Sequence, residues 1–208
     1  MLYWFLKPIV SILLKVVFRF RAFGVKNVPQ QGSVLLVSNH LSWFDPLFPA
    51  NALWRKVHFL AKAELFKIPV FNWLITVLNA FPVKRGTIDR QALNRTLGVL
   101  NRGGVLLIFP EGTRSKTGQL QKLKPGVSLI AFQSRAAVIP TYILGSEKIL
   151  PPGGKMVRFP RIQVHFGPAL NLNHYYQLPP GRKVYDGITE EIWQALSRLE
   201  KCVLGEQQ

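Results

Sequence analysis

Short, continuous apolar runs recur along this chain of 208 residues, and stretches with helical spacing separate them. The clearest run is VLLIFPE at 105–111, and SVLLVSNH at 33–40 has the same character. A strand that is apolar at nearly every position is buried on both faces, as the central strands of parallel sheets are. The alternation of such strands with helices predicts an α/β fold, with a mostly parallel central sheet flanked by helices.

The rest of the globular part follows the same alternation. Further strands are predicted at 57–64, 80–85 and 137–143, and prolines make 156–167 a candidate for edge strands. The predicted helices begin at Asp45, acting as N-cap, and at Thr87, which caps a helix reaching Asn101, and the others cover 71–78, 125–135 and 188–204.

Residues 2–20 predict an amphipathic helix at the N-terminus. Polar, mostly cationic residues recur every four positions and therefore form a stripe on one helical face: Lys7, Ser11, Lys15 and Arg19. Aromatic and aliphatic side chains occupy the rest of the helix surface. Such a helix suits the plane of a bilayer interface, with its cations directed at lipid phosphates. Packing on the protein's own core and a tilted or re-entrant insertion are the alternatives.

The charge balance indicates an anionic partner. The chain has 27 basic and 10 acidic residues, a net charge of +17, which attracts nucleic acid, anionic membranes or phosphorylated small molecules. Nucleic acid is disfavoured, because the cations are not gathered in one arm or helix and no paired-cysteine zinc module occurs. The single cysteine, Cys202, excludes a disulfide framework within one chain and favours a reducing compartment. Its side chain is expected to be small, partly buried and inert.

A candidate general base follows the first buried strand. In parallel sheets, sites form beyond the carboxyl ends of the strands, and His40 and Asp45 lie there in NHLSWFD. A carboxylate on one imidazole nitrogen makes the other nitrogen a base. Because no G-x-S-x-G elbow occurs, the nucleophile is expected to be a substrate hydroxyl. The alternatives are a Ser42–His40 pair, purely structural roles for both residues, and a metal site with Glu111, which lacks the usual zinc-site spacing.

A candidate phosphate-binding loop follows the clearest strand, in FPEGTRS at 109–115. The Gly-Thr turn offers backbone N–H groups, and Arg114 offers a planar fork that matches a phosphate. Lys84, Arg85 and Lys124 can add positive charge at the same edge. The structural alternative is a simple ion pair between Glu111 and Arg114.

These blocks together resemble the glycerolipid acyltransferase family of the 1-acylglycerol-3-phosphate acyltransferases. Four blocks occur in the family's order: NHLSWFD (39–45), FPVKRG (81–86), FPEGTRS (109–115) and VIPTYI (138–143). The segment 59–75 resembles the family's connecting segment, so the similarity spans roughly residues 30–170.

The resemblance implies that an acyl group passes from acyl-CoA or acyl-carrier protein to the sn-2 hydroxyl of lysophosphatidic acid, giving phosphatidic acid. His40 would be the general base and Asp45 would orient it. Arg85 and Arg114 would hold the phosphate. The remaining implied substrate-binding residues are Lys84, Lys124, Glu111, Gly112 and Thr113.

The resemblance also implies no metal and no prosthetic group, since the acyl donor is a co-substrate. The expected location is the cytoplasmic face of a membrane, with a membrane-associating helix and linker at 1–31 and the acyltransferase domain at 32–208. Residues 1–31 are too few for two full membrane helices, which favours peripheral or monotopic attachment. The alternatives are another acceptor, such as lyso-ornithine lipid or lysophosphatidylglycerol, and a non-enzymatic basic protein that binds membrane or nucleic acid.

Overall fold

The structure, a computed structural model, describes residues 2–84, 89–115, 117–151 and 156–205. Two residues singled out in the sequence, Arg85 and Thr87, lie outside the described residues.

The described residues form a seven-stranded sheet in the order β1-β7-β6-β2-β5-β3-β4. Neighbouring strands are parallel except β6 and β7, which confirms the predicted α/β fold with a mostly parallel sheet. The strands are β1 (Arg21–Phe23), β2 (Val34–Ser38), β3 (Val57–Lys62), β4 (Ala80–Val83), β5 (Val105–Ile108), β6 (Ala137–Leu144) and β7 (Gln163–Phe166).

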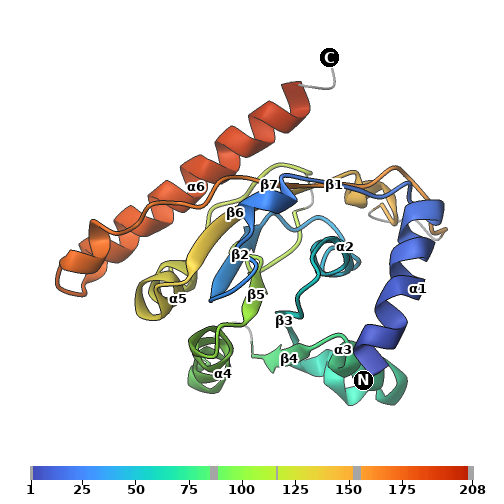
Figure 1. The fold of residues 1–208 in the computed structure, drawn as a ribbon, viewed down its shortest axis with the longest axis horizontal. Helices are drawn as coiled ribbons and strands as arrows, with labels where there is room; N and C mark the ends of the chain where they lie inside the picture. Colours follow the sequence, from blue (N-terminus) through green and yellow to red (C-terminus); the bar gives the residue numbers. More distant parts are fainter. Residues whose placement is uncertain (1, 85–88, 116, 152–155, 206–208) are drawn as a thin grey trace.

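Two layers of helices cover the sheet, with α4, α5 and α6 along one side and α1, α2 and α3 along the other (Figure 1). The helices are α1 (Leu2–Val17), α2 (Leu47–Ala52), α3 (Pro69–Val77), α4 (Arg90–Asn101), α5 (Gly126–Ser134) and α6 (Arg182–Gly205). Short 3₁₀ turns lie at Val25–Asn27, Ala63–Lys67, Ser146–Lys148 and Tyr175–Gln177.

The buried strand β2 packs against both helical layers. Leu36 packs in the cluster that contains residues of α1 and α2, whereas Leu35 packs in the cluster that contains residues of α4, α5 and α6. Alternate side chains of a strand point to opposite faces, so a strand between two helical layers must be apolar throughout. This requirement explains the continuous apolar run at 34–37.

Strand β7 corrects one prediction. It was expected at an edge, but it lies between β6 and β1, because Arg21–Phe23 adds an outer strand that was not predicted. The prolines of 156–167 do not interfere, since Pro160 precedes the strand, which begins at Gln163. β1 also lies inside the segment 1–31 and pairs with the main sheet.

Both predicted helix caps are replaced by other residues. Helix α2 has Pro46 at its N-cap position, and the Asp45 carboxylate turns back to the N–H groups of Leu41 and Ser42. Helix α4 begins at Arg90, with Asp89 as N-cap accepting the N–H of Ala92 at 2.9 Å. An Asp carboxylate at this position satisfies a backbone donor that has no partner within the helix.

The last helix is longer than predicted and begins at Arg182 rather than at residue 188. Cys202, expected to be partly buried, is exposed on it.

Helix α1 is present, but the predicted orientation of its polar stripe is wrong for Lys7 and Ser11. Lys7 is only 6 % exposed, and its ammonium donates to the carbonyl oxygens of Ala50, at 3.0 Å, and Leu53. Ser11 Oγ donates to Asn51 Oδ1 at 3.1 Å. The carbonyls at the end of a short helix have no donors of their own, so a buried ammonium is stabilised there.

The opposite side of α1 is apolar and exposed. Its exposed apolar side chains are Trp4, Phe5, Ile9, Ile12, Leu13 and Val16. Within the part of the chain that the structure describes, no helix combines the length and apolar content needed to cross a membrane.

Candidate active site

Two loops at the carboxyl edge of the sheet are joined by backbone hydrogen bonds. One loop follows β2 and begins at Asn39, and the other follows β5 and covers 109–115. Because β2 and β5 are parallel neighbours, their carboxyl ends meet. Ser115 donates its N–H to the carbonyl of His40 at 2.7 Å, and His40 donates its N–H to Glu111 Oε1 at 3.2 Å. The two sequence blocks therefore form one site.

Asn39 sets the point at which the chain leaves the sheet. Its buried side chain donates to the carbonyl of Ile143 at 2.9 Å and accepts the N–H of Ile143 at 2.8 Å. The amide thus extends the pairing of β2 with β6 by one step and frees the backbone of residue 40 to turn away. This role was not predicted, although a polar amide directly after a buried apolar strand was the signal.

His40 and Asp45 meet, as their spacing indicated. His40 Nδ1 lies 2.8 Å from Asp45 Oδ2, and the same oxygen accepts the N–H groups of Leu41 at 2.6 Å and Ser42 at 2.7 Å. Asp45 is fully buried. Because an ionised carboxylate only accepts hydrogen bonds, an imidazole that donates from Nδ1 to Asp45 has Nε2 as its basic nitrogen.

Phe109 holds the plane of the imidazole. Its ring stacks on His40 with a centroid distance of 4.1 Å and an interplanar angle of 20°. Phe109 lies in the FPEGTRS segment but was not predicted as a site residue. The hydroxyl of Ser42, the alternative nucleophile, accepts the N–H of Phe44 at 3.4 Å and so has a local role in the turn.

Glu111 is a buried carboxyl group and not an exposed ligand. It is 4 % exposed. Burial raises the pKa of Glu111 to about 7, the N–H groups of His40 and Gln121 oppose this shift, and the nearby charge of Asp45 adds to it. The side chain therefore supports the backbone of His40, and an uncharged carboxyl is favoured below neutral pH.

The cations of the second loop are exposed beside this carboxyl group. The predicted alternative of a Glu111–Arg114 ion pair is wrong, since among the described residues Arg114 instead lies over the ring of Trp43. Lys124 reaches the same loop: its N–H donates to the carbonyl of Pro110 at 2.9 Å. A Cβ added at Gly112, where φ is +74°, would lie 2.5 Å from Lys124 Nζ. The left-handed backbone therefore favours glycine there, and a larger residue would also displace the end of the Lys124 side chain.

Of the other predicted residues, Thr113 is exposed on the same loop. Lys84 directly follows β4, which β3 and β5 separate from β2, and its N–H donates to Asp89 Oδ2 at 2.9 Å. Arg85 follows it in the sequence and is not described. Over the described ranges, no three His, Cys, Asp or Glu side chains gather as a group that could hold a metal ion.

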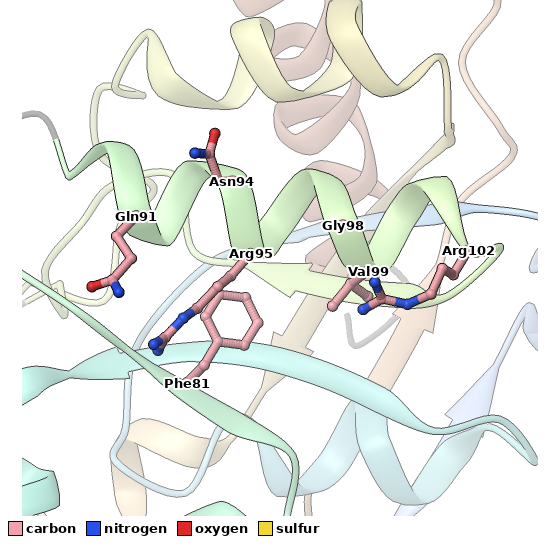
Figure 2. Close-up of a pocket in the computed structure, with 7 residues that line it drawn as sticks. All are labelled: Phe81, Gln91, Asn94, Arg95, Gly98, Val99 and Arg102. Carbon is pink, nitrogen blue, oxygen red and sulfur yellow. The ribbon is translucent and has the colours of Figure 1, made fainter.

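A groove of about 430 Å³ lies away from these loops, between α4 and the edge strand β4 (Figure 2). Phe81 of β4 and Arg95 and Arg102 of α4 line it, together with Gln91, Asn94, Gly98 and Val99. None of the candidate catalytic residues faces it.

Comparisons with known proteins identify the family of the chain. The family model named Acyltransferase matches residues 19–144, which include both loops. The chain is 32 % identical over 148 residues to the chloroplastic 1-acyl-sn-glycerol-3-phosphate acyltransferase LPAT1 of Arabidopsis thaliana, covering 70 % of this chain and 41 % of that protein. It is 32 % identical over 164 residues to the lyso-ornithine lipid O-acyltransferase of Pseudomonas aeruginosa, covering 71 % and 61 %. The chain thus spans about two fifths of the plant relative and about three fifths of the bacterial one.

One solved structure has the same fold. The crystal structure of the 1-acyl-sn-glycerophosphate acyltransferase from Thermotoga maritima matches with a TM-score of 0.69 and 21 % identity, over 92 % of this chain and 79 % of that one.

Proposed function

This chain belongs to the acyltransferase family, and from that premise we propose that it acylates the sn-2 hydroxyl of lysophosphatidic acid, giving phosphatidic acid. The acyl donor is acyl-CoA or acyl-carrier protein. The observation that carries this proposal is the contact of 2.8 Å between His40 Nδ1 and the buried Asp45 carboxylate, beside exposed cations. The Arabidopsis relative named for this activity supports the choice of acceptor.

In the reaction, His40 Nε2 takes the proton of the acceptor hydroxyl as its oxygen attacks the thioester carbonyl. A C–O bond forms, and the tetrahedral intermediate then expels the thiolate as the C–S bond breaks. The His40 imidazolium returns its proton to the leaving sulfur. Asp45 stabilises the imidazolium between the two steps without taking its proton. Neither a metal nor a prosthetic group is needed, since the donor brings the activated acyl group.

The acceptor's phosphate binds among the cations of the edge. Arg114, in the loop 109–115, and Lys124, which reaches this loop, are both exposed, and we assign the phosphate to them, with Lys84 and Arg85 extending the positive field. The N–H of Thr113 adds a donor at this loop, whereas the N–H of Gly112 already donates to the carbonyl of Phe109 at 3.0 Å. An exposed guanidinium and ammonium around one short loop suit a phosphate monoester better than an uncharged headgroup.

A second candidate acceptor is lyso-ornithine lipid, which the similarity to the Pseudomonas enzyme favours. Its headgroup has no phosphate for Arg114 to bind. Comparing the two acceptors therefore tests the phosphate assignment as well as the substrate.

Helix α1 is assigned to the interface of an anionic membrane at its cytoplasmic face. Its outer side is apolar, and Lys15 and Arg19 are exposed at its C-terminal end, where they can reach lipid phosphates. Its inner side is attached to α2 through Lys7, and α2 begins two residues after Asp45. The helix that meets the lipid is thereby connected to the catalytic turn.

The test is a matrix of acyl donors and acceptors, measured with wild type, His40→Ala and the control His174→Ala. His174 is exposed and pairs with Glu191 at 3.2 Å, away from both loops. We expect phosphatidic acid from wild type and His174→Ala, and none above background from His40→Ala. Retention of most activity by His40→Ala would overturn the mechanism, whereas a preference for lyso-ornithine lipid would change the acceptor alone.

A further inference from the structure

Trp43 is an exposed aromatic side chain in the middle of the catalytic turn. It lies between His40 and Asp45 and is 51 % exposed. The guanidinium carbon of Arg114 lies 4.2 Å from the centroid of its ring, within the range of a cation–π contact. This contact joins the turn that contains the general base, His40, to the loop that contains Arg114, the residue proposed to bind the phosphate.

The backbone around Trp43 is held firmly. The Asp45 carboxylate accepts two N–H groups from residues before the tryptophan, and the N–H of Asp45 donates to the carbonyl of Ser42 at 3.3 Å. After it, the N–H of Leu47 donates to the carbonyl of Phe44 at 3.0 Å. The Asp45 carboxylate that orients His40 therefore also fixes the backbone from which the Trp43 side chain extends.

Arg114 has a fixed backbone and a long, exposed side chain. The N–H of the adjacent Ser115 donates a hydrogen bond to the carbonyl of His40. No acidic side chain pairs with Arg114 in the described part of the chain, and its guanidinium contact is the Trp43 ring. An arginine on such a loop otherwise samples many rotamers, and ordering it on binding costs affinity.

A stacked guanidinium keeps its best hydrogen-bonding groups available. Its N–H donors lie in the plane of the group, whereas the ring occupies one face. The fork can therefore meet two phosphate oxygens while the aromatic ring restricts its movement.

We propose that Trp43 is a positioning residue that holds the Arg114 guanidinium for the acceptor's phosphate, at a set distance from His40. This inference rests on the proposed function, in which Arg114 binds that phosphate. One turn then carries both the base and the support of the phosphate ligand.

The test is a double-mutant cycle with Trp43→Leu, Arg114→Gln and the double variant, using a short-chain soluble lysophosphatidic acid so that membrane binding does not contribute. We expect Trp43→Leu to raise KM for this acceptor roughly two- to five-fold, leaving KM for the donor unchanged. Trp43→Phe, which keeps an aromatic face, should recover part of the loss. In the Arg114→Gln background, Trp43→Leu should have no further effect on KM. The control Trp54→Leu removes another exposed tryptophan, 77 % exposed and outside both loops, and should match wild type.

The outcomes separate the two proposals. An equal effect of Trp43→Leu with and without Arg114, or no effect at all, overturns the role of Trp43 while leaving the acyltransferase mechanism intact. An unchanged acceptor KM in Arg114→Gln alone overturns the phosphate assignment and the role of Trp43 with it. Only retention of activity by His40→Ala bears on the proposed chemistry itself.

Discussion

The buried carboxyl group of Glu111 makes the stability of this protein depend on pH in a definite direction. Its pKa is raised from 4.5 to about 7 in the folded protein, chiefly by burial. The folded state therefore retains a proton that the unfolded state releases between these two values. The contribution of Glu111 to stability is greatest below pH 4.5. It falls as the pH rises from 4.5 to about 7 and is constant above about pH 8.

The size of the effect follows from the shift. Each unit of pKa difference corresponds to about 1.4 kcal/mol, so ionisation of Glu111 lowers the free energy of unfolding by about 3 kcal/mol between pH 4.5 and pH 8. Glu111→Gln removes the titration and retains an oxygen that can accept the N–H of His40. The difference in unfolding free energy, wild type minus variant, should fall by that amount over the same range.

Urea unfolding followed by circular dichroism, at several pH values in one detergent, measures this difference. Comparing the two proteins cancels the titration of groups that do not interact with Glu111. Glu190→Gln, the same change at an exposed position of α6, should follow wild type at all pH values. Parallel stability curves for wild type and Glu111→Gln, or a difference that rises with pH, would refute the assignment of a proton-holding buried carboxyl.

Two further predictions concern the turn after β2. Asp45→Asn should lower kcat by roughly 10²- to 10⁴-fold with a smaller effect on KM, because an amide cannot stabilise the His40 imidazolium; steady-state kinetics measure both constants, and a kcat within three-fold of wild type would contradict the role. Asn39→Ala should lower the free energy of unfolding by about 2–4 kcal/mol, since it leaves the buried N–H and carbonyl of Ile143 without partners. Urea unfolding measures this loss, and a change below about 0.5 kcal/mol would show that water or another group satisfies Ile143.

The local pattern of apolar and polar residues was enough to predict the central strands and the candidate site. Strands β2 and β5 are buried on both faces, so their sequences had to be apolar throughout, and the run could be recognised without a structure. His40 and Asp45 lie five residues apart in one turn, close enough for the spacing alone to indicate their contact. Their catalytic roles, and the phosphate-binding role of Arg114, stay predictions.

Contacts between distant segments could not be predicted in this way. The burial of Lys7 depends on carbonyl groups 43 and 46 residues away at the end of α2, and the helical stripe alone is equally consistent with lipid phosphates. The three-residue strand β1 is too short for a periodic pattern and exists because β7 offers it backbone partners.

The amino-acid sequence by itself determined the α/β fold class, the order of the apolar strands along the chain, and the pairing of imidazole with carboxylate, because each depends on residues close together in the chain. Tertiary structure alone decided that Lys7 turns inward, that β7 is internal, and that Arg114 lies over Trp43 and does not pair with Glu111. The buried Glu111 carboxyl accepts the N–H of His40, whereas the exposed guanidinium of Arg114 lies over the aromatic ring that the catalytic turn presents.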